Sequence, residues 1–497
     1  MDISEIKRII DDDYNSEIKK YARIGQKYYE AQHDILKYRL FYYNADGKLV
    51  EDKYRNNARI SHPFFTELSD QLSSYMLSFK ENPMQAKDSA EGLQGYLDKY
   101  FDDEFWAEVR ELITGTYNKG FEYLYAYKNK DDRMTFQCAD SMGVVEVRAK
   151  DTDDKCECYI YWYIDRIEKG RKEIKRIQVW TAKNVSYYVQ EGNGQIEIDK
   201  DEKINPRPHV IYTDTAGEKR GYSFGYIPFW RLDYNKKRIS GLKPVKPLID
   251  DYDIMQCGLT NNLVDFDTPL HVVKGFDGDN LDELQQNLKV KKVIGVVEEG
   301  GVEVKTIDIP YQARQAKAAE DEKNIYRFGM GLNMSGLKDT SATTNIAIKA
   351  AYFLLDMKAN RLEIRLKKML RQLLEIVINE INENNKTGYK VSDVKIIFKR
   401  SVMTNETENA SNDKIKAEKQ QVQINTLLSL AATLDNETIV RAICEVMDID
   451  YEEIKDRLPE DGEYQTKKAQ EILDGVIPDE GGGIDESKTK GSAAGPS

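Results

Sequence analysis

The sequence predicts an α+β fold, and three patterns along the chain support this prediction. Apolar residues near the N-terminus recur every three or four positions, as on one face of a helix. Between about residues 120 and 215, short β-rich runs alternate with clusters of Asp, Lys, Gly and Asn, which is typical of antiparallel strands joined by turns. From Thr344 to about Asn384 the helical spacing returns over about forty residues, enough for a helix about 60 Å long.

Composition and charge limit the classes of protein to consider. The chain has 497 residues, of which 40% are hydrophobic and 32% charged, so two or three folded domains are expected. No apolar run is long enough to span a membrane, and the first ten residues, MDISEIKRII, do not form a signal peptide. The net charge of −13 argues against tight, general nucleic-acid binding through a basic surface, but it is compatible with a protein that tolerates DNA without binding it tightly. We therefore expect a cytosolic product with no membrane partner.

The cysteine and histidine patterns predict neither a metal site nor a catalytic centre. The five cysteines are scattered, and the one close pair, Cys156 and Cys158, lacks two further ligands at a plausible spacing. The four histidines are isolated in the sequence, and His62 precedes a helix, where capping or packing explains it. We expect reduced thiols and no cofactor.

The N-terminal part combines helices with a tyrosine-rich meander of strands. Helical stripes lie on both sides of residue 60, and the second begins at Ser61 as N-cap with Pro63 near the first turn. A further helical stretch covers about 90–118 and carries Trp106. The tyrosines of the meander are interpreted as packing surface, because basic residues are not interleaved on the same face as a base-stacking platform requires.

Two helices flank a compact α/β insert in the middle of the chain. The first should run from about Leu248 to Phe266 and the second should follow Pro310, with a hairpin turn of the insert at residues 298–301. After the long helix we expect a buried strand, DVKIIFKRSV, and then two or three helices between about 411 and 475. The C-terminal tail lacks apolar residues able to order it.

The long helix has two contrasting faces. One is an apolar stripe that must be covered by other parts of the protein, since an exposed stripe of that length would aggregate: Leu362, Leu366, Met369, Leu373 and Val377. The other is a basic face, interpreted either as solvated with pairs to Glu363 and Glu375 or as a contact with an acidic neighbour or DNA: Arg361, Arg365, Lys367, Lys368 and Arg371.

The segment GMGLNMSGLKDTSATTNIAIK at residues 329–349 has the spacing of a phosphate-binding loop. Gly331 and Gly336 are separated as in a Walker A motif, and the loop runs into a helix N-terminus. A Walker A motif requires a buried strand before the loop and lysine directly after the second glycine. Here a charged helix precedes it and Leu337 takes the lysine position, so the sequence argues strongly against nucleotide hydrolysis. A helix–helix linker is the simpler interpretation, but such a connection needs only about 2–8 residues, and the extra length indicates a functional loop.

Four blocks of sequence follow one another in a recognisable order. They are ARISHPFFTELSDQLSSYMLS (58–78), the region from GYIPFW to LHVVKG (225–275), GLKDTSATTNIAIKAAYFLLDMKANRLE (336–363) and LDNETIVRAICEVMDIDYEEI (434–454). In this order the chain resembles the portal (head-to-tail connector) proteins of tailed double-stranded-DNA bacteriophages, particularly those of long-tailed phages. The resemblance covers the chain from about residue 50 to about residue 460. No single block is specific by itself, and the resemblance depends on the four blocks occurring in this order.

This resemblance implies a portal-type fold and a ring, typically a dodecamer, around a DNA channel. The implied parts are a mixed α/β wing (1–240), a first stem helix (241–266), a small α/β clip (267–309), a second stem helix (310–331), a tunnel loop (332–343), a wing spine helix and strand (344–405), a helical crown (406–475) and a disordered tail (476–497). The family has no catalytic residues to transfer, because ATP hydrolysis belongs to the terminase motor that docks at the clip.

The resemblance also places candidate site residues. The tunnel loop would present Asn333, Ser335, Leu337, Lys338, Asp339 and Thr340. Acidic residues suit the lining of a passage for DNA, because few phosphates are then neutralised, and the candidates are Asp250, Asp251, Asp253, Glu320, Asp321 and Glu322. For each of them an ordinary solvated helix face is the alternative. Basic residues of the second stem helix, among them Lys317, are interpreted as partners for neighbouring subunits, and the clip surface would carry Lys289, Lys291 and Lys292.

The function implied is that of a ring at one capsid vertex, assembled in the host cytoplasm and retained in the virion. DNA would be packaged through it by the terminase and later ejected. Implied partners are further copies of the chain, double-stranded DNA, terminase, major capsid and scaffolding proteins and a head-completion adaptor. The main alternative is another virion interaction protein, such as an adaptor or capsid-associated scaffold, and a P-loop-like NTPase is a distant third.

Overall fold

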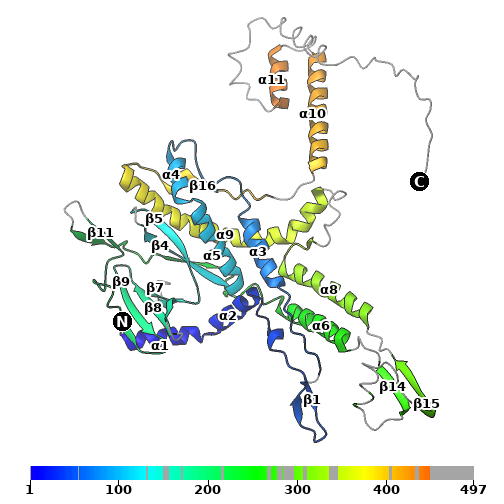
Figure 1. Cartoon of the computed structure of the whole chain (residues 1–497). Helices are drawn as coiled ribbons and strands as arrows, with labels where there is room; N and C mark the ends of the chain where they lie inside the picture. Colours follow the sequence, from blue (N-terminus) through cyan, green and yellow to red (C-terminus); the bar gives the residue numbers. More distant parts are fainter. Residues whose placement is uncertain are drawn as a thin grey trace, which may run out of the picture. The chain divides into compact units, whose positions relative to one another are not determined.

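A computed structural model describes most of the chain, in two compact units. The described residues are 2–53, 55–129, 132–148, 156–168, 172–213, 218–265, 270–276, 282, 284, 296–305, 310–334, 345–401, 406–430 and 436–447. One unit comprises residues 1–339 with 346–403, and the other comprises residues 340–345 with 404–497. The first unit contains all the sheets of the described residues together with the helices α1 to α8 and most of α9 (Figure 1).

The N-terminal region is helical, as predicted, but each predicted helical stretch is divided or shortened. Its helices are α1 (Ile3–Tyr14), α2 (Glu17–Tyr29), η1 (Asp34–Lys37), α3 (Phe64–Met76), α4 (Leu93–Tyr100) and α5 (Asp103–Lys119). The stretch at about 90–118 divides because Asp102 starts a new helix: its carboxylate accepts a hydrogen bond from the Phe105 backbone N–H at 3.0 Å.

The predicted antiparallel meander is confirmed, and it forms two sheets. Strands β10 (Ile196–Ile198), β9 (Val185–Glu191), β8 (Lys172–Trp180), β7 (Cys156–Glu168) and β6 (Val144–Arg148) make a five-stranded sheet in that order. Strands β13 (Phe229–Asp233), β4 (Phe121–Lys128) and β5 (Met134–Ala139) make a three-stranded sheet. Two further antiparallel pairs are β11 (Val210–Thr213) with β12 (Lys219–Tyr222) and β1 (Phe41–Tyr43) with β2 (Leu49–Glu51).

The long predicted helix is present as α9 (Asn345–Asn385) and lies in the largest hydrophobic core. Its apolar stripe is buried as predicted; Leu366, Leu373 and Val377 have no exposed surface. This stripe packs in one cluster with residues of α3 and α5. Each fully buried Leu or Val side chain contributes about 1.5–3 kcal/mol, so α9 is a main source of the stability of this unit. The predicted strand after it is shorter than expected: only β16 (Val394–Ile396) pairs, with β3 (Met84–Ala86).

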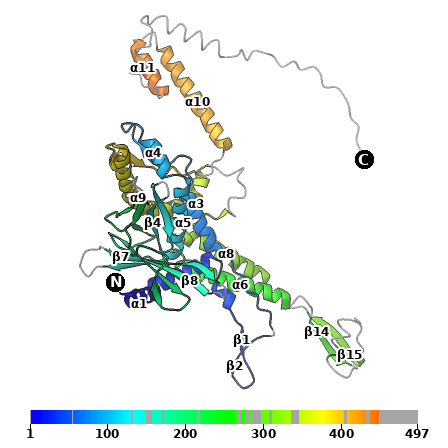
Figure 2. The same ribbon diagram turned by 60° about the vertical axis from the view of Figure 1, so that its left-hand side comes forward.

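Two helices and a hairpin occupy the middle of the chain. The predicted helices are present as α6 (Lys246–Asp265) and α8 (Tyr311–Gly329), side by side, and between them in the chain lies the antiparallel hairpin of β14 (Leu270–Phe276) and β15 (Val296–Lys305) (Figures 1 and 2). The predicted hairpin turn at residues 298–301 is wrong. These residues belong to β15, because a bulge opposite Gly275, whose φ is +64°, accommodates the extra residues within the strand.

The second unit contains α10 (Glu406–Ser429) and α11 (Asn436–Met447), which contact each other. The Gln420 side-chain amide donates to the Val446 carbonyl at 3.2 Å. Two of the two or three helices predicted for this region are thus described, the second beginning at Asn436. The remaining predictions for residues 448–497 lie outside the described residues. Among the helices that are described, none combines the length and the apolarity needed to span a bilayer.

Candidate functional site

Helices α6 and α8 are joined by an ionic contact within the subunit. The Lys317 ammonium on α8 lies 2.6 Å from a carboxylate oxygen of Asp251 on α6, and it also contacts Asp321 one turn further along α8. Lys317 therefore already has partners within its own chain, and its pairing with a neighbouring subunit stays a prediction. Lys317 pairs within the chain because the side-by-side arrangement of α6 and α8 places Asp251 within reach.

Two of the six predicted channel-lining carboxylates are buried in the subunit. Asp253 has no exposed surface and Asp321 is 2% exposed. Neither side chain is accessible at the surface of the subunit, so the prediction that these two residues line a channel is corrected. Helical periodicity places both on a face that turns toward the protein. A carboxylate buried in this way requires hydrogen-bond partners or a counter-charge, and both residues have them.

Asp253 is held between two histidines. Its Oδ2 lies 2.6 Å from Nδ1 of His33, and its Oδ1 lies 2.7 Å from Nδ1 of His62 and accepts from the His62 backbone N–H at 3.0 Å. Burial opposes the ionisation of Asp253, but the hydrogen bonds from His33 and His62 outweigh it and lower its pKa. The sequence analysis treats these histidines as isolated, and no local pattern reveals that they share one carboxylate from 220 and 191 residues away.

Four predicted carboxylates are at the surface. Asp250 accepts hydrogen bonds from the Tyr28 hydroxyl and, at 2.7 Å, from Lys246. Asp251 is about half exposed, Glu320 is exposed and Glu322 is partly exposed. The Asn333 side-chain amide donates to Glu322 at 3.4 Å, so the one described residue of the predicted loop site is in contact with α8. The acidic candidates that are accessible are therefore Asp250, Asp251, Glu320 and Glu322.

The segment that leads from α8 toward residues 335–344 is held in place by α3 and α9. Leu332 makes a pair of 2.9 Å hydrogen bonds with the Gln71 side chain, one through its N–H and one through its carbonyl. A Cβ atom on Gly331 would lie 2.2 Å from Leu68, so only glycine allows this close approach. Ser335, Leu337, Lys338, Asp339 and Thr340 lie outside the described residues, as do Lys289, Lys291 and Lys292.

A buried lysine completes the attachment of the end of α8. Lys358 on α9 is 2% exposed, and its ammonium donates to the carbonyls of Gly329 at 3.0 Å and Leu68 at 3.4 Å. The ring of Tyr117 lies 4.6 Å from the same ammonium. Burial lowers the pKa of Lys358 to about 7. A cation at the C-terminal carbonyls of α8 complements the helix dipole, so Lys358 and Gln71 together fix the point where the chain leaves α8. The sequence analysis missed both residues, because each looks like an ordinary polar position on a helix.

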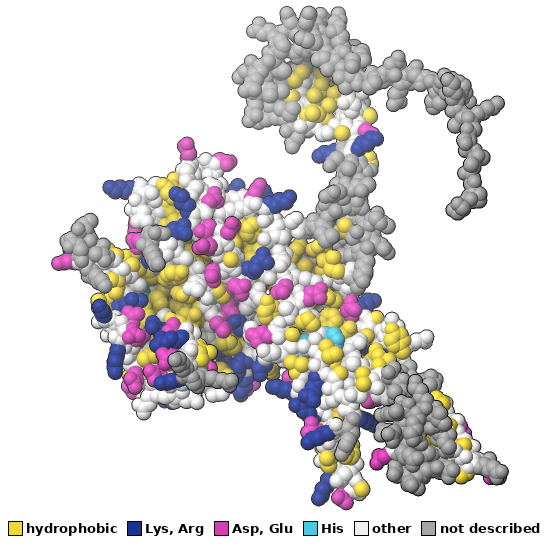
Figure 3. Space-filling model, viewed as in Figure 1, with side chains coloured by type: hydrophobic (Ala, Val, Ile, Leu, Met, Phe, Trp, Pro, Cys, Tyr) yellow, Lys and Arg dark blue, Asp and Glu magenta, His cyan; other side chains and the backbone are white. Residues whose placement is uncertain are grey.

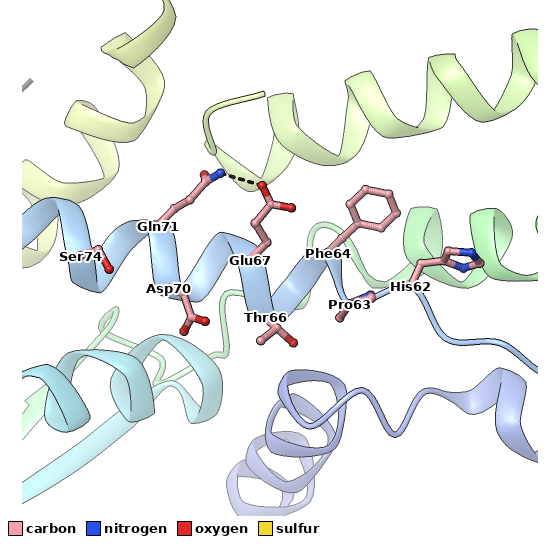
Figure 4. A pocket seen from close by; sticks show the side chains of 8 residues that line it. All are labelled: His62, Pro63, Phe64, Thr66, Glu67, Asp70, Gln71 and Ser74. Carbon is pink, nitrogen blue, oxygen red and sulfur yellow. Dashed lines mark hydrogen bonds between the residues drawn. The ribbon is translucent and has the colours of Figure 1, made fainter. Parts of the chain in front are cut away.

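An open groove runs along α3 beside this attachment point (Figure 4). It has a volume of about 720 Å³ and is lined by His62, Pro63, Phe64, Thr66, Glu67, Asp70, Gln71 and Ser74. Glu67 accepts from the Tyr326 hydroxyl at 2.6 Å and from Gln71 at 3.0 Å, so the groove wall and the end of α8 form one hydrogen-bonded arrangement. Within the residues that the structure describes, no group of three His, Cys, Asp or Glu side chains is arranged to hold a metal ion.

The rejection of a Walker A motif agrees with the described geometry. The residues before the loop form helix α8, not a strand, and the chain leaves that helix through Met330 in the left-handed conformation with φ +53°. The ion pairs of α6 and α8 and the hydrogen bonds at the loop base position segments of the chain, as is usual in the class of structural proteins.

Comparison of the sequence with known proteins agrees with this class. Residues 7–467 match the family described as "Phage portal protein, SPP1 Gp6-like", and the chain belongs to this family. It is 25% identical over 409 residues to the portal protein of Bacillus phage SPP1, covering 82% of this chain and 78% of that protein. It is 24% identical over 433 residues to the portal protein of Clostridium phage phiCD119, covering 82% of this chain and 88% of that protein. The resemblance to portal proteins of long-tailed phages is confirmed, and the family is one of structural virion components.

Proposed function

We propose that copies of this chain assemble into a closed ring, a dodecamer, at one vertex of the capsid. DNA is packaged through the ring by the terminase and later leaves through it, and a head-completion adaptor attaches the tail. Major capsid and scaffolding proteins surround the ring during assembly in the host cytoplasm. The observation that carries this proposal is the order α6, β14–β15 hairpin, α8, anchored loop base and α9 in a member of the portal family.

The stem of the proposed channel is the α6–α8 pair. Each phosphate that a protein neutralises releases counterions and adds affinity, so a wall that passes DNA should carry few accessible cations. Asp250, Asp251, Glu320 and Glu322 are accessible acidic groups on this pair, and Lys317 is neutralised by Asp251 and Asp321. Lys323 and Arg327 of α8 are also exposed, so these groups support a lining of mixed charge in which the carboxylates limit the number of neutralised phosphates.

The proposed tunnel loop is the segment 332–343. Lys338 is the single Lys or Arg in that segment of the sequence. The base of the segment is held by Gln71 and Lys358, as a loop that contacts moving DNA requires. Lys338→Glu should change the rate or extent of DNA packaging and leave the yield of rings unchanged. Collapse of ring assembly in this variant would mean that the loop is structural.

The proposed clip is the insert 267–309, of which the β14–β15 hairpin is described. An isolated two-stranded hairpin is marginally stable in water. Val297 and Val304 of β15 are at least half exposed, which supports pairing or packing with the same insert of a neighbouring subunit. Deletion of residues 267–309 should leave a folded body and abolish rings.

Electron microscopy of the purified protein, with mass measurement in solution, tests the proposal directly. Closed rings from the full-length chain and monomers from the deletion variant are the expected result. Intact rings from the deletion variant would overturn the clip assignment. A full-length chain that never forms rings, alone or with scaffolding protein, would favour the adaptor or scaffold alternative.

A further inference from the structure

Residues 36–60 form an arm that projects from the body beside α6 (Figures 1 and 2). Its outer part is the β1–β2 hairpin, with a turn at Asn44–Gly47 in which Gly47 has φ +71°. All six strand residues of the hairpin are exposed. Figure 3 shows the arm as a finger that carries hydrophobic and charged side chains.

The root of the arm is tied to α6 by a regular ladder. Every second residue of the extended segment 56–62 bonds to every fourth residue of α6: Asn56 with Asp265, Ala58 with Asn261, Ile60 with Cys257 and His62 with Asp253. The two spacings agree because two residues of an extended segment advance about 6.6 Å along its axis, and four residues of a helix advance about 6 Å. The segment therefore lies along α6 in one register.

The other end of the arm is fixed to the same helix. His33, just before the arm, bonds to the other oxygen of Asp253, and Asp34 pairs with Lys246 at 2.6 Å. Both ends of the arm are therefore tied to α6 and come together at Asp253, through His33 and His62, so the hairpin is held at a defined place beside the helix. A rigid root of this kind suits an arm that makes a specific contact, since little conformational entropy is then lost on binding.

The hairpin exposes apolar side chains on both of its faces. Residues directly opposite in the register share a face, so Phe41, Tyr43 and Leu49 lie on one face and Tyr42 with Val50 on the other. Tyr43 is 73% exposed and Leu49 is 59% exposed. A two-stranded hairpin gains independent stability only when a face is covered. Among the described residues of the subunit, none covers most of Tyr43 or Leu49.

We propose that the arm docks on a second copy of this chain, as a strap between neighbouring subunits of the ring; this rests on the proposed ring assembly. The arm carries six Lys or Arg residues against three Asp or Glu residues, whereas the whole chain has a net charge of −13, so the arm and the surface of another copy have complementary charge. An arm that meets a different surface of its neighbour makes a head-to-tail contact, the kind that closes rings.

The side chains of the arm favour a protein partner over nucleic acid. Aromatic and basic residues suit either partner. The exposed aliphatic side chains Leu36, Leu49, Val50 and Ile60 cannot stack on bases, and they gain free energy by burial against protein. Binding of the arm to nucleic acid is therefore the alternative result that would contradict the proposal.

Two measurements on the full-length chain test the strap. First, a photo-crosslinking phenylalanine analogue is placed at Tyr43, and irradiation should join two copies of the chain. Second, Tyr43→Asp with Leu49→Asp should lower the ring fraction at fixed protein concentration by about tenfold or more, as expected for the loss of interface anchors. The matched control is Ile164→Asp with Ile167→Asp on β7, which places the same charges on exposed isoleucines away from the arm and should leave the ring fraction unchanged. Both double variants should melt as the wild type does.

The results separate the strap from the ring itself. Closed rings that are insensitive to the arm variant and give no crosslink between copies would overturn the strap and leave the ring standing. A crosslink between copies without closed rings would refute the ring and retain the arm contact. A crosslink from Tyr43 to DNA in place of protein would overturn the strap in favour of a nucleic-acid arm. An equal loss of rings in the control variant would also count against it.

Discussion

Helix α9 and the α6–α8 pair with its arm differ in how they are held. In α9, fourteen residues are buried, most of them apolar and packed in the main core. In α6 only Ile249, Asp253 and Cys257 are buried, and the helix is tied to its surroundings through carboxylates, histidines and a lysine. The body is therefore stable by its own packing, whereas the projecting parts hold their position through polar contacts and leave apolar side chains exposed.

The largest expected effect comes from a charge in the core of α9. Leu366→Asp buries an ionisable group without a partner at a fully buried site and should lower the free energy of unfolding by about 4 kcal/mol. Ile364→Asp, two residues away and 73% exposed, is the control and should change it by less than about 0.5 kcal/mol. Thermal melts of both variants measure this difference. An unchanged melting temperature for Leu366→Asp would show that the wrong face of α9 has been assigned to the core.

The second effect concerns the polar root of the arm. Asp253→Ala leaves His33 and His62 without their shared acceptor and should cost about 2–3 kcal/mol, mainly by local opening. Hydrogen exchange should increase in residues 33–62 and remain slow in α9. Asp251→Ala, at a half-exposed carboxylate, is the control, with an expected cost of about 1 kcal/mol or less. Equal protection of residues 33–62 in the Asp253 variant and the wild type would contradict the role of the histidine pair.

The same root should be sensitive to acid. The folded-state pKa of Asp253 lies below its ordinary value of 3.8, so the unfolded chain binds the proton more tightly. The contribution of Asp253 is therefore complete above about pH 4–5 and is lost as the pH falls through the folded-state pKa. The stability difference between the wild type and Asp253→Ala should shrink below pH 4. A constant difference down to pH 2.5 would argue against this titration.

An effect in the same direction, but at higher pH, is expected at Lys358. Its pKa is lowered to about 7 from 10.5, so the unfolded chain holds the proton more tightly between these values and the folded chain gains stability as the pH rises through them. Lys358→Met removes this dependence, whose slope is at most about 1.4 kcal/mol per pH unit. The wild type should therefore gain melting temperature relative to Lys358→Met between pH 7 and pH 9.5. Lys349→Met changes an exposed lysine of the same helix, and its melting temperature should depend on pH as that of the wild type does. The same pH dependence of the melting temperature in all three proteins would refute the titration of Lys358.

The smallest effect on folding is expected for the basic face of α9. Arg365 and Lys368 are exposed, so their double reversal to Glu should change the free energy of unfolding by less than about 0.5 kcal/mol. If this face meets an acidic neighbour or DNA, the ring yield or the retained DNA should fall. Lys390→Glu with Lys395→Glu makes the same charge change at exposed positions beyond α9. Equal behaviour of the two double variants would favour a merely solvated face, in line with the 2.7 Å pair between Lys367 and Glu363 on the same helix.

The sequence by itself determined the elements whose signal is local. The stripe from Leu362 to Val377, the helices α6 and α8 and the antiparallel meander follow from periodicity and turn residues, because the side chains of one element repeat with its own geometry. The arm also has a local signal, Asp46-Gly47 between the runs FYY and LVE, which is typical of a hairpin. The portal family was recognisable because its blocks keep their order along the chain.

Only the tertiary structure decided which charged residues are buried and what they contact. Asp250, Asp251 and Asp253 look alike on one helix, yet one contacts Tyr28 and Lys246, one pairs with Lys317 and one is enclosed by two histidines. Burial depends on which face of α6 meets α8 and the N-terminal segment, and apart from Lys246, four residues from Asp250, the partners lie between 66 and 222 residues away. Because the free energy of a charge depends on these distant partners more than on its own position in a helix, no local pattern contains that information.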